Sequence, residues 1–277
     1  MFQRFANSWQ LVKSSAAVLQ ADTELLVFPI LSAAGVLLLT ASFAVPILVT
    51  GSAERVESTP LGLVVAFLFY LATYFVIFFC NSALVGAAMI RLRGGDPTVR
   101  DGLKIAFGHI GPIFGYALLA ATVGVLLRAI QERAGLLGRI VVSLVGFAWS
   151  VATFLAVPVL VCENLGPVDA VKRSAELLKK TWGEQVIGNS GIGSVFGLLI
   201  VLVIFCSVPL LILAASVSPV ALIGALSVVV FTVISLAILN AALSSIYTAA
   251  VYLYAAEGAT GSSFQPSMIQ GAFRAKN

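Results

Sequence analysis

The residue with the most specific chemical potential in this sequence is Glu163, an acid at the end of a long apolar run. Asn164 follows it directly, and Lys172 and Arg173 come one short turn later. A carboxylate in this position could bind a ligand. It could also cap or pair with the next helix, because negative charge is stabilising near a helix N-terminus. The pattern favours this structural role over a ligand or transport role.

A second candidate group consists of polar residues inside apolar runs. Its members are Asn81, Ser82, Asn240, Ser244, Ser245 and Thr248. An amide or hydroxyl in hydrocarbon needs a hydrogen-bond partner, so such residues often join helices to one another. They can also line a path through the membrane. Helix packing is the favoured interpretation, and the lining of a path stays open as an alternative.

Enzyme chemistry is not indicated by any motif. The single histidine, His109, cannot assemble the histidine sets typical of zinc sites. Cys80, Cys162 and Cys206 lie within apolar segments and have no Cys-x-x-Cys spacing. Phosphate-binding loops, dinucleotide fingerprints, nucleophile elbows and HExxH motifs do not occur in the sequence. We therefore expect no enzyme activity, no cofactor and no metal.

Long apolar runs must position these residues. Of the 277 residues, 60% are hydrophobic and 10% are charged, whereas soluble domains contain roughly 25% charged residues. Six runs reach the length of about 20 residues that a membrane span needs. They are Leu25–Val49, Leu61–Ile90, Ile110–Leu127, Ile140–Cys162, Val186–Ala215 and Val220–Ala256. The sequence therefore predicts an all-α polytopic membrane protein with about six transmembrane helices and a single membrane domain, 1–277.

The connections between these runs predict the topology. The N-terminal segment, the second and fourth connections and the tail hold 12 of the 16 Lys and Arg residues. Positive residues favour the cytoplasmic side, so both termini are expected in the cytoplasm, with the chain in a bacterial-type inner membrane. The uncharged turn at 216–219 predicts a tight extracytoplasmic hairpin, and a re-entrant segment is the less favoured alternative. Positive charge in short loops suits anionic lipid headgroups rather than nucleic acid.

Three cytoplasmic segments have the periodicity of amphipathic helices. The apolar faces comprise Phe2, Phe5, Trp9, Val12 and Leu19, then Val168, Val171, Ala175, Leu178 and Trp182, and, more weakly, Val99, Leu103, Ala106 and Ile110. Basic polar faces with Trp on the apolar side predict helices that lie in the headgroup interface. The residues expected to contact lipid are Trp9, Lys13, Arg91, Arg93, Lys172, Arg173, Lys179, Lys180 and Trp182.

Separate parts of the chain also resemble one another in sequence. Residues 8–13 align with 174–179, and Asn81-Ser82 occupies the place in its span that Ser244-Ser245 occupies in another. This similarity predicts a parallel repeat of one amphipathic helix followed by two spans, and chance similarity between hairpins is the alternative. The three repeats would be 1–95, 96–166 and 167–277.

The stretch Pro158–Trp182 is the most distinctive part of the sequence. A proline near the end of a span, then Glu163, a short turn and an Ala-x-Lys-Arg-Ser-x-x-Leu helix ending at Trp182 resembles a group of uncharacterised bacterial six-span membrane proteins. It is more loosely similar to the membrane domain of some glycerophosphodiester phosphodiesterases. The resemblance implies a six-helix membrane fold. It transfers no active site, because that chemistry belongs to a soluble domain that we do not expect in this chain.

Two functional hypotheses follow. The first is a non-enzymatic membrane component that organises lipids or partner proteins through its cytoplasmic amphipathic helices. The alternative is a channel or passive transporter, including one formed only in a homo-oligomer, with a path lined by the intramembrane polar residues. No acid or base lies clearly at a bilayer midplane, which argues against a proton-coupled pump.

Overall fold

The computed structural model describes residues 2–50, 59–182, 192–259 and 264, and all regular structure within these ranges is helical. Six segments in this part of the chain are long and apolar enough to cross a membrane. They are Thr23–Val49, Leu61–Leu92, Ile110–Arg133, Leu137–Cys162, Phe196–Val217 and Pro219–Glu257. The protein is therefore an all-α, multi-pass membrane protein, as the sequence predicts. The predicted start of the fifth run, Val186, lies outside the described residues.

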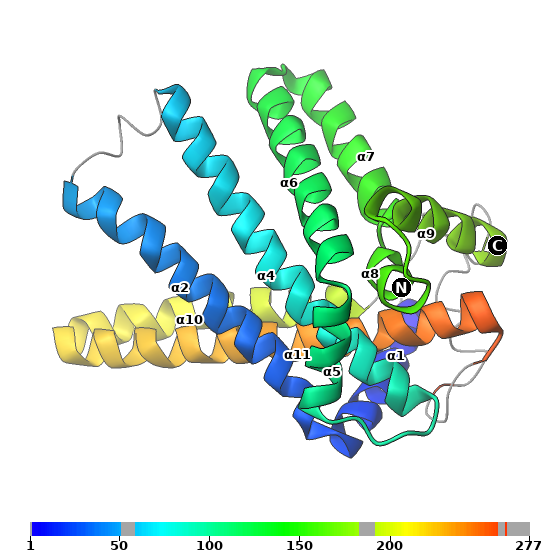
Figure 1. Ribbon diagram of the computed structural model, residues 1–277. Helices are drawn as coiled ribbons and strands as arrows, with labels where there is room; N and C mark the ends of the chain where they lie inside the picture. The colour runs from blue at the N-terminus through cyan, green and yellow to red at the C-terminus, as the bar shows by residue number, and fades with distance from the viewer. Residues whose placement is uncertain (1, 51–58, 183–191, 260–263, 265–277) are drawn as a thin grey trace.

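The spans form three helical hairpins that point in different directions from one end of the molecule (Figure 1). The hairpins are α2 (Val27–Thr50) with α4 (Pro60–Leu92), α6 (Ile110–Arg133) with α7 (Leu136–Ala152), and α10 (Ile192–Val217) with α11 (Pro219–Glu257). The shorter helices gather where the hairpins meet. They are α1 (Phe2–Ala21), η1 (Thr23–Leu26), α5 (Val99–Gly108), α8 (Ala156–Cys162) and α9 (Pro167–Trp182).

The last hairpin is closed by a tight turn. Ser218 accepts a hydrogen bond from the Ala221 amide at 3.1 Å, and Pro219 occupies the first turn of α11. This is a standard way to start a helix, because the hydroxyl satisfies a free amide and proline has no amide to satisfy. The structure therefore has the predicted hairpin at 216–219, and the re-entrant alternative is wrong.

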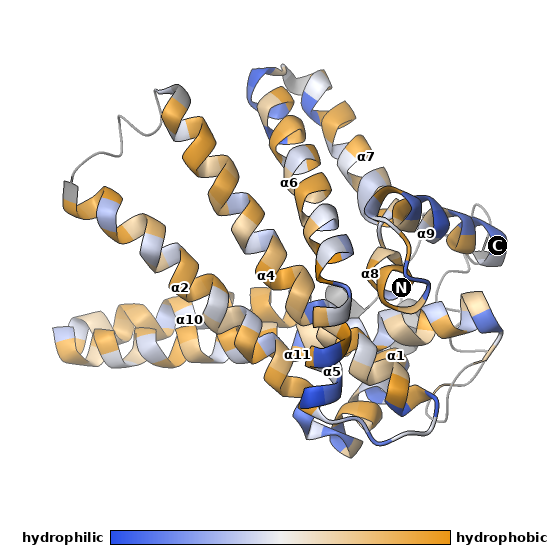
Figure 2. Ribbon diagram, viewed as in Figure 1, coloured by the Kyte–Doolittle hydropathy of each residue, from blue (hydrophilic) through white to orange (hydrophobic). Residues whose placement is uncertain are grey.

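Buried residues concentrate where the hairpins meet. We call this region the base, and it comprises the shorter helices, residues 80–92 of α4, residues 242–257 of α11 and the short connections at 22, 93–98 and 163–166. Ala83, Ala88, Ala249 and Ala250 are completely buried there. The remaining, outward parts of the three hairpins are called the arms, and most of their apolar side chains are exposed. Figure 2 shows the arms as mainly apolar, with hydrophilic residues at the base and at the outer ends of α6 and α7.

The boundary between arms and base matches the thickness of a bilayer. Counting about 20 residues inward from the outer end of each span gives Ile30, Cys80, Phe114, Ala156, Leu198 and Ile238. Buried residues begin close to these positions, at Phe28, Cys80, Ile113, Leu155, Phe196 and Ala242. Most of the buried residues that lie further out are on α6. Lipid therefore suffices to cover the arms, and protein covers the base.

Close packing in the base depends on small residues. A Cβ atom added to Gly102 of α5 would lie 2.7 Å from the backbone carbonyl oxygen of Ala83 and would also clash with the Phe28 ring. The helices α4 and α5 can approach this closely only because Gly102 has no side chain. Phe28 is itself completely buried, so the start of the first span is locked against both helices.

The fourth span is interrupted at residues 153–155, between α7 and α8. Pro158 explains the position, because its ring would clash with the carbonyl of Phe154 in a continuous helix. The Leu155 amide donates a hydrogen bond to Ser174 Oγ of α9 at 2.9 Å, and both residues are buried. A backbone amide released inside a membrane protein needs such a partner, so α9 completes the broken span.

The amphipathic helices pack mainly against the base. The buried residues are Leu11, Val12, Ser15, Val18 and Leu19 of α1, Gly102 and Ala106 of α5, and Ala170, Ser174, Leu177 and Leu178 of α9. Val12, Leu19, Ala106 and Leu178 were predicted to insert into the headgroup region, and this is wrong for these four, because protein covers them. The predicted face of α9 is also shifted, since Val168 is 52% exposed and Ala170 is buried. The side chains of Phe2, Phe5 and Trp182 lie outside the described part of the structure.

Candidate functional site

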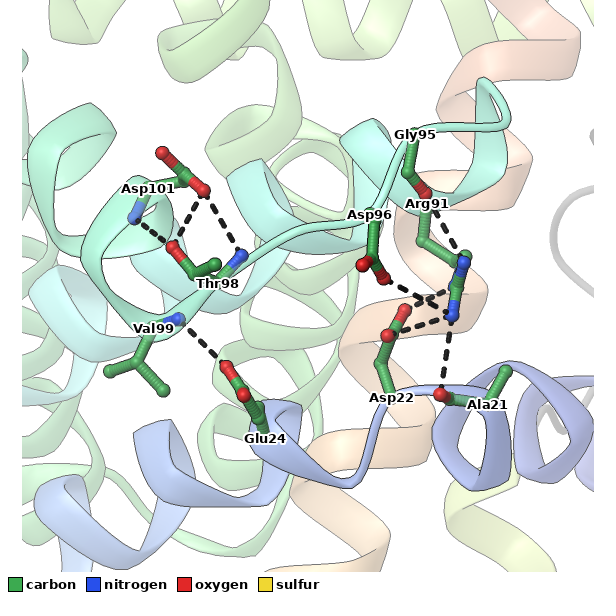
Figure 3. A network of polar contacts seen from close by, with 9 residues as sticks. All are labelled: Ala21, Asp22, Glu24, Arg91, Gly95, Asp96, Thr98, Val99 and Asp101. Atoms are coloured by element: carbon green, nitrogen blue, oxygen red, sulfur yellow. Dashed lines mark hydrogen bonds and ion pairs between the residues drawn. The ribbon is translucent and has the colours of Figure 1, made fainter.

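Arg91, at the end of α4, contacts four residues, Ala21 and Asp22 at the end of α1 and Gly95 and Asp96 in the connection to α5 (Figure 3). Its Nη2 donates to Asp22 Oδ1 at 2.8 Å and to the Ala21 carbonyl at 3.2 Å. Its Nη1 donates to the Gly95 carbonyl at 3.2 Å, and Asp96 lies 3.7 Å away. The Asp22 side chain is only 8% exposed, and a buried carboxylate needs a cation beside it. Arg91 was predicted to contact lipid, whereas its Nη1 and Nη2 donors are directed at protein oxygens and the side chain is 26% exposed.

The beginning of α5 is fixed beside this ion pair. Thr98 Oγ1 accepts from the Asp101 amide at 3.2 Å, and Asp101 Oδ2 accepts from the Thr98 amide at 3.1 Å, which completes a capping box. The Thr98 hydroxyl also donates to Asp101 Oδ2 at 2.6 Å, and this hydrogen bond, followed by the one from the Thr98 amide, holds the pKa of Asp101 below its usual value. Glu24 adds a contact from η1, since its Oε2 accepts from the Val99 amide at 3.2 Å (Figure 3).

Glu163 links the ends of two spans to α9. Arg173 Nε donates to its Oε2 at 2.9 Å and to its Oε1 at 3.2 Å. The Tyr252 hydroxyl of α11 also donates to Oε1 at 3.2 Å. Asn164 makes the turn that follows with a left-handed backbone, φ 50°, a conformation that asparagine tolerates better than most residues. The contacts of Glu163 are those of the structural alternative, an ion pair that joins a span to the next helix.

A third ion pair joins the ends of α4 and α11, where Arg93 Nη2 lies 2.5 Å from Glu257 Oε1. Both side chains are about half exposed, so solvent weakens this pair. The ends of the second, fourth and sixth spans are thus each held by an arginine–carboxylate pair. Sequence reasoning missed Asp22 and Glu257 as partners. Their position at the ends of apolar runs, as for Glu163, was the available signal.

Five of the residues predicted to contact lipid are exposed, namely Trp9, Lys13, Lys172, Lys179 and Lys180. Lys172 pairs with Asp169 of its own helix at 3.2 Å, and both side chains are largely exposed. Lys13, Lys179 and Lys180 are exposed and make no ion pair with any residue that the structure describes. Trp9 is 43% exposed. Three arginines of the base, Arg91, Arg93 and Arg173, thus pair with carboxylates, whereas Lys13, Lys179 and Lys180 are directed outward.

The polar residues of the spans make contacts in pairs rather than one continuous row. Ser245 Oγ of α11 donates to Asn81 Oδ1 of α4 at 2.7 Å. Within α11, Ser244 Oγ donates to Asn240 Oδ1 at 3.3 Å, and Thr248 Oγ1 donates to the Ser244 carbonyl at 2.8 Å. Ser82 is buried, and its hydroxyl has no hydrogen-bond partner among the described residues. This arrangement supports helix packing as the main role of the group.

Asn81 also lies between two cavities. One, of about 550 Å³, is bounded by α2, α4 and α11. The other, of about 350 Å³, is bounded by α4, α6, α11 and the region of the broken fourth span, and Tyr116, Trp149 and Thr153 contribute to its wall. Asn81 is thus the member of the predicted polar group that lines both spaces. No group of three or more His, Cys, Asp or Glu residues that could hold a metal occurs in the described ranges.

Comparison with known proteins identifies a family. A model of a family of unknown function, DUF6159, matches residues 60–264. The chain belongs to this family. Neither the curated proteins nor the solved structures include a match. The DUF6159 match contains Asn81, Arg91 and Glu163, whereas Asp22 lies outside it. Membership of DUF6159 assigns an activity to none of these residues.

Proposed function

We propose that this protein is a non-enzymatic component of a bacterial inner membrane that retains anionic lipids at its base. The observation that supports the proposal is that some basic side chains of the base are paired with carboxylates and others are not. Arg91, Arg93 and Arg173 have carboxylate partners. Lys179 and Lys180, in the last turn of α9, are exposed and have none in the described part of the chain.

The position of these lysines suits lipid headgroups. The base begins where the hydrocarbon-length part of each span ends, so its surface lies next to the headgroups. A Lys or Arg near an anionic membrane surface contributes about 1 kcal/mol of attraction. The unpaired lysines on α1 and α9 can therefore concentrate acidic lipids around the base. The excess of Lys and Arg at this end supports a cytoplasmic base and cytoplasmic termini.

The repeated order of elements supports a threefold repeat as part of the proposal. Each of α1, α5 and α9 precedes a pair of spans, which corresponds to 1–95, 96–166 and 167–277. An alignment of DUF6159 sequences should then show related positions in the three units. If the apolar positions in that alignment followed a different pattern in each of the three units, the repeat would be contradicted.

The function is tested by native mass spectrometry of the protein released from nanodiscs of phosphatidylglycerol and phosphatidylcholine. The wild-type protein should retain phosphatidylglycerol, and the variant Lys13→Gln/Lys179→Gln/Lys180→Gln should retain much less. The matched control, Arg133→Gln/Arg139→Gln, removes cations at the outer end of an arm and should behave as wild type. Equal retention by the lysine variant would contradict the proposal. The same spectra report whether subunits associate.

A further inference from the structure

We propose that the groove between α2, α4 and α11 binds diacylglycerol, a glycerolipid with an uncharged hydroxyl head. The groove has a volume of about 550 Å³ and is formed wholly by residues of three spans. This site is distinct from the lysines proposed to hold anionic lipid, and it would take a lipid of different charge.

The polarity of the groove changes along its length. Towards the base its wall contains Ser32, Asn81, Ser244 and Ser245. Towards the outer ends of the arms the wall is apolar. The outward residues include Leu37, Ile77 and Ile234. An occupant with a hydrogen-bonding head and an acyl tail fits this gradient, with its head at the base and its tail along the arms.

The polar end lies at the depth of lipid hydroxyl and ester groups. Asn81 follows directly on the 20 residues of α4 that cross the hydrocarbon, and Ser32 of α2 lies within two residues of the corresponding limit, Ile30. Lipid surrounds the arms on all sides that protein leaves open, so the bilayer itself supplies the occupant. Its glycerol would lie at the level of Asn81 without a shift from its ordinary depth.

The lining of the groove selects an uncharged head. The residues that line the groove include no Lys, Arg, Asp or Glu, and a phosphate enclosed without a cation would lose its hydration uncompensated.

Asn81 supplies the donor that recognises the head. Its Oδ1 accepts from Ser245 at 2.7 Å, its Nδ2 has no acceptor among the described residues, and the residue lines the groove. A side-chain amide nitrogen carries two protons that it can donate. A hydroxyl or ester oxygen of diacylglycerol would accept one of them.

The test uses a photoreactive diacylglycerol analogue in nanodiscs, with the labelled peptides identified by mass spectrometry. Labelling of α2, α4 and α11 is expected. Ala237 lines the groove, so Ala237→Phe should fill it and abolish this labelling. The control Ala148→Phe adds the same ring to an exposed alanine of α7 and should leave it unchanged. Asn81→Leu should weaken binding about fivefold, the loss expected for one hydrogen bond.

Three outcomes would overturn the proposal. They are labelling spread evenly over all spans, equal labelling of the Ala237→Phe and wild-type proteins, and competition by phosphatidylglycerol as effective as by unlabelled diacylglycerol. The lysine variant separates the two proposals, because it should lose phosphatidylglycerol and keep diacylglycerol labelling. Failure of either proposal would then leave the other intact.

Discussion

The inner and outer parts of α11 show how the same helix behaves in two surroundings. In the outer part, Val220 and Phe231 are 78% and 73% exposed, whereas Ile246 and Val251 in the inner part are completely buried. Both parts are largely apolar, although the inner part also contains Ser244, Ser245, Thr248 and all three tyrosines of the helix. What differs is the covering, which is lipid around the arms and protein around the base. The base therefore behaves like the core of a soluble helical protein built on the ends of membrane spans.

Charge follows the same division. The base contains pairs such as Asp22 with Arg91 and Glu163 with Arg173, which join elements far apart in the sequence. The arms have charged pairs only near their outer ends, where Arg128 contacts Glu132 and the Tyr70 hydroxyl among the described residues. Substitutions in the base should consequently cost more stability than comparable substitutions in the arms.

The largest effect is expected from Arg91→Gln, because it leaves Asp22 buried without its cation. Breaking a buried pair in this way costs about 3 kcal/mol, measured as a lower midpoint of thermal unfolding in detergent. Arg93→Gln is the matched control two residues away. Its partner Glu257 is exposed, so the expected cost is below about 1 kcal/mol. Equal losses in the two variants would show that burial of Asp22 does not determine the stability of the base.

The next largest effect is expected from Gly102→Ala. The added methyl group meets the Ala83 carbonyl and the Phe28 ring, and overpacking of this kind costs about 2 kcal/mol. Gly108→Ala tests the same helix at a place where a Cβ atom has no neighbour within 4 Å, and it should be neutral or slightly stabilising. The comparison is made by thermal unfolding of both variants. A similar midpoint for both would contradict close contact between α4 and α5.

A smaller effect is expected from Ser174→Ala, which leaves the Leu155 amide of the broken span without its partner. A buried donor left unsatisfied costs about 1–2 kcal/mol. Ser150→Ala is the control, because the exposed Ser150 hydroxyl donates a hydrogen bond to the Gly146 carbonyl within its own helix. Amide hydrogen exchange should be faster at Leu155 in the first variant only. Unchanged exchange at Leu155 would exclude Ser174 as the partner.

The smallest effect is expected in an arm. Phe231→Ala removes an exposed aromatic side chain, and lipid can fill the space, so the stability in nanodiscs should change by less than about 0.5 kcal/mol. Tyr247→Ala is a contrasting truncation on the same helix, where the side chain is buried, and about 3 kcal/mol should be lost. Similar losses of stability in the two variants would contradict the distinction between arm and base.

Sequence alone predicts the spans well, because length and apolar content are local properties. The hairpin at 216–219 is predicted for the same reason. The inward face of α9 was not predicted, because Val168 and Ala170 differ little in sequence pattern and the choice depends on Ser174 reaching Leu155. The partners Asp22 and Arg91 were not predicted either. They are 69 residues apart, and only the packing of α1 against the end of α4 brings them together.

For the candidate site, the sequence predicts residue types better than it predicts contacts. Glu163 and Arg173 were chosen as neighbours along the chain, and the structure pairs them. Asn81 and Ser245 were chosen separately as intramembrane polar residues, and their hydrogen bond between α4 and α11 is visible only in three dimensions. The groove beside Asn81 depends on how three hairpins diverge, which no local pattern encodes.

The central claim, that lipid covers the arms and protein and water cover the base, is tested most directly by the accessibility of nitroxide spin labels. In nanodiscs, labels at Leu38, Leu68 and Phe231 should collide with oxygen, which concentrates in hydrocarbon. Labels at Ala17, Lys104 and Lys179, which are exposed in the base, should collide instead with a water-soluble nickel chelate. High oxygen accessibility at all six positions would contradict the claim, because the base would then lie within the bilayer.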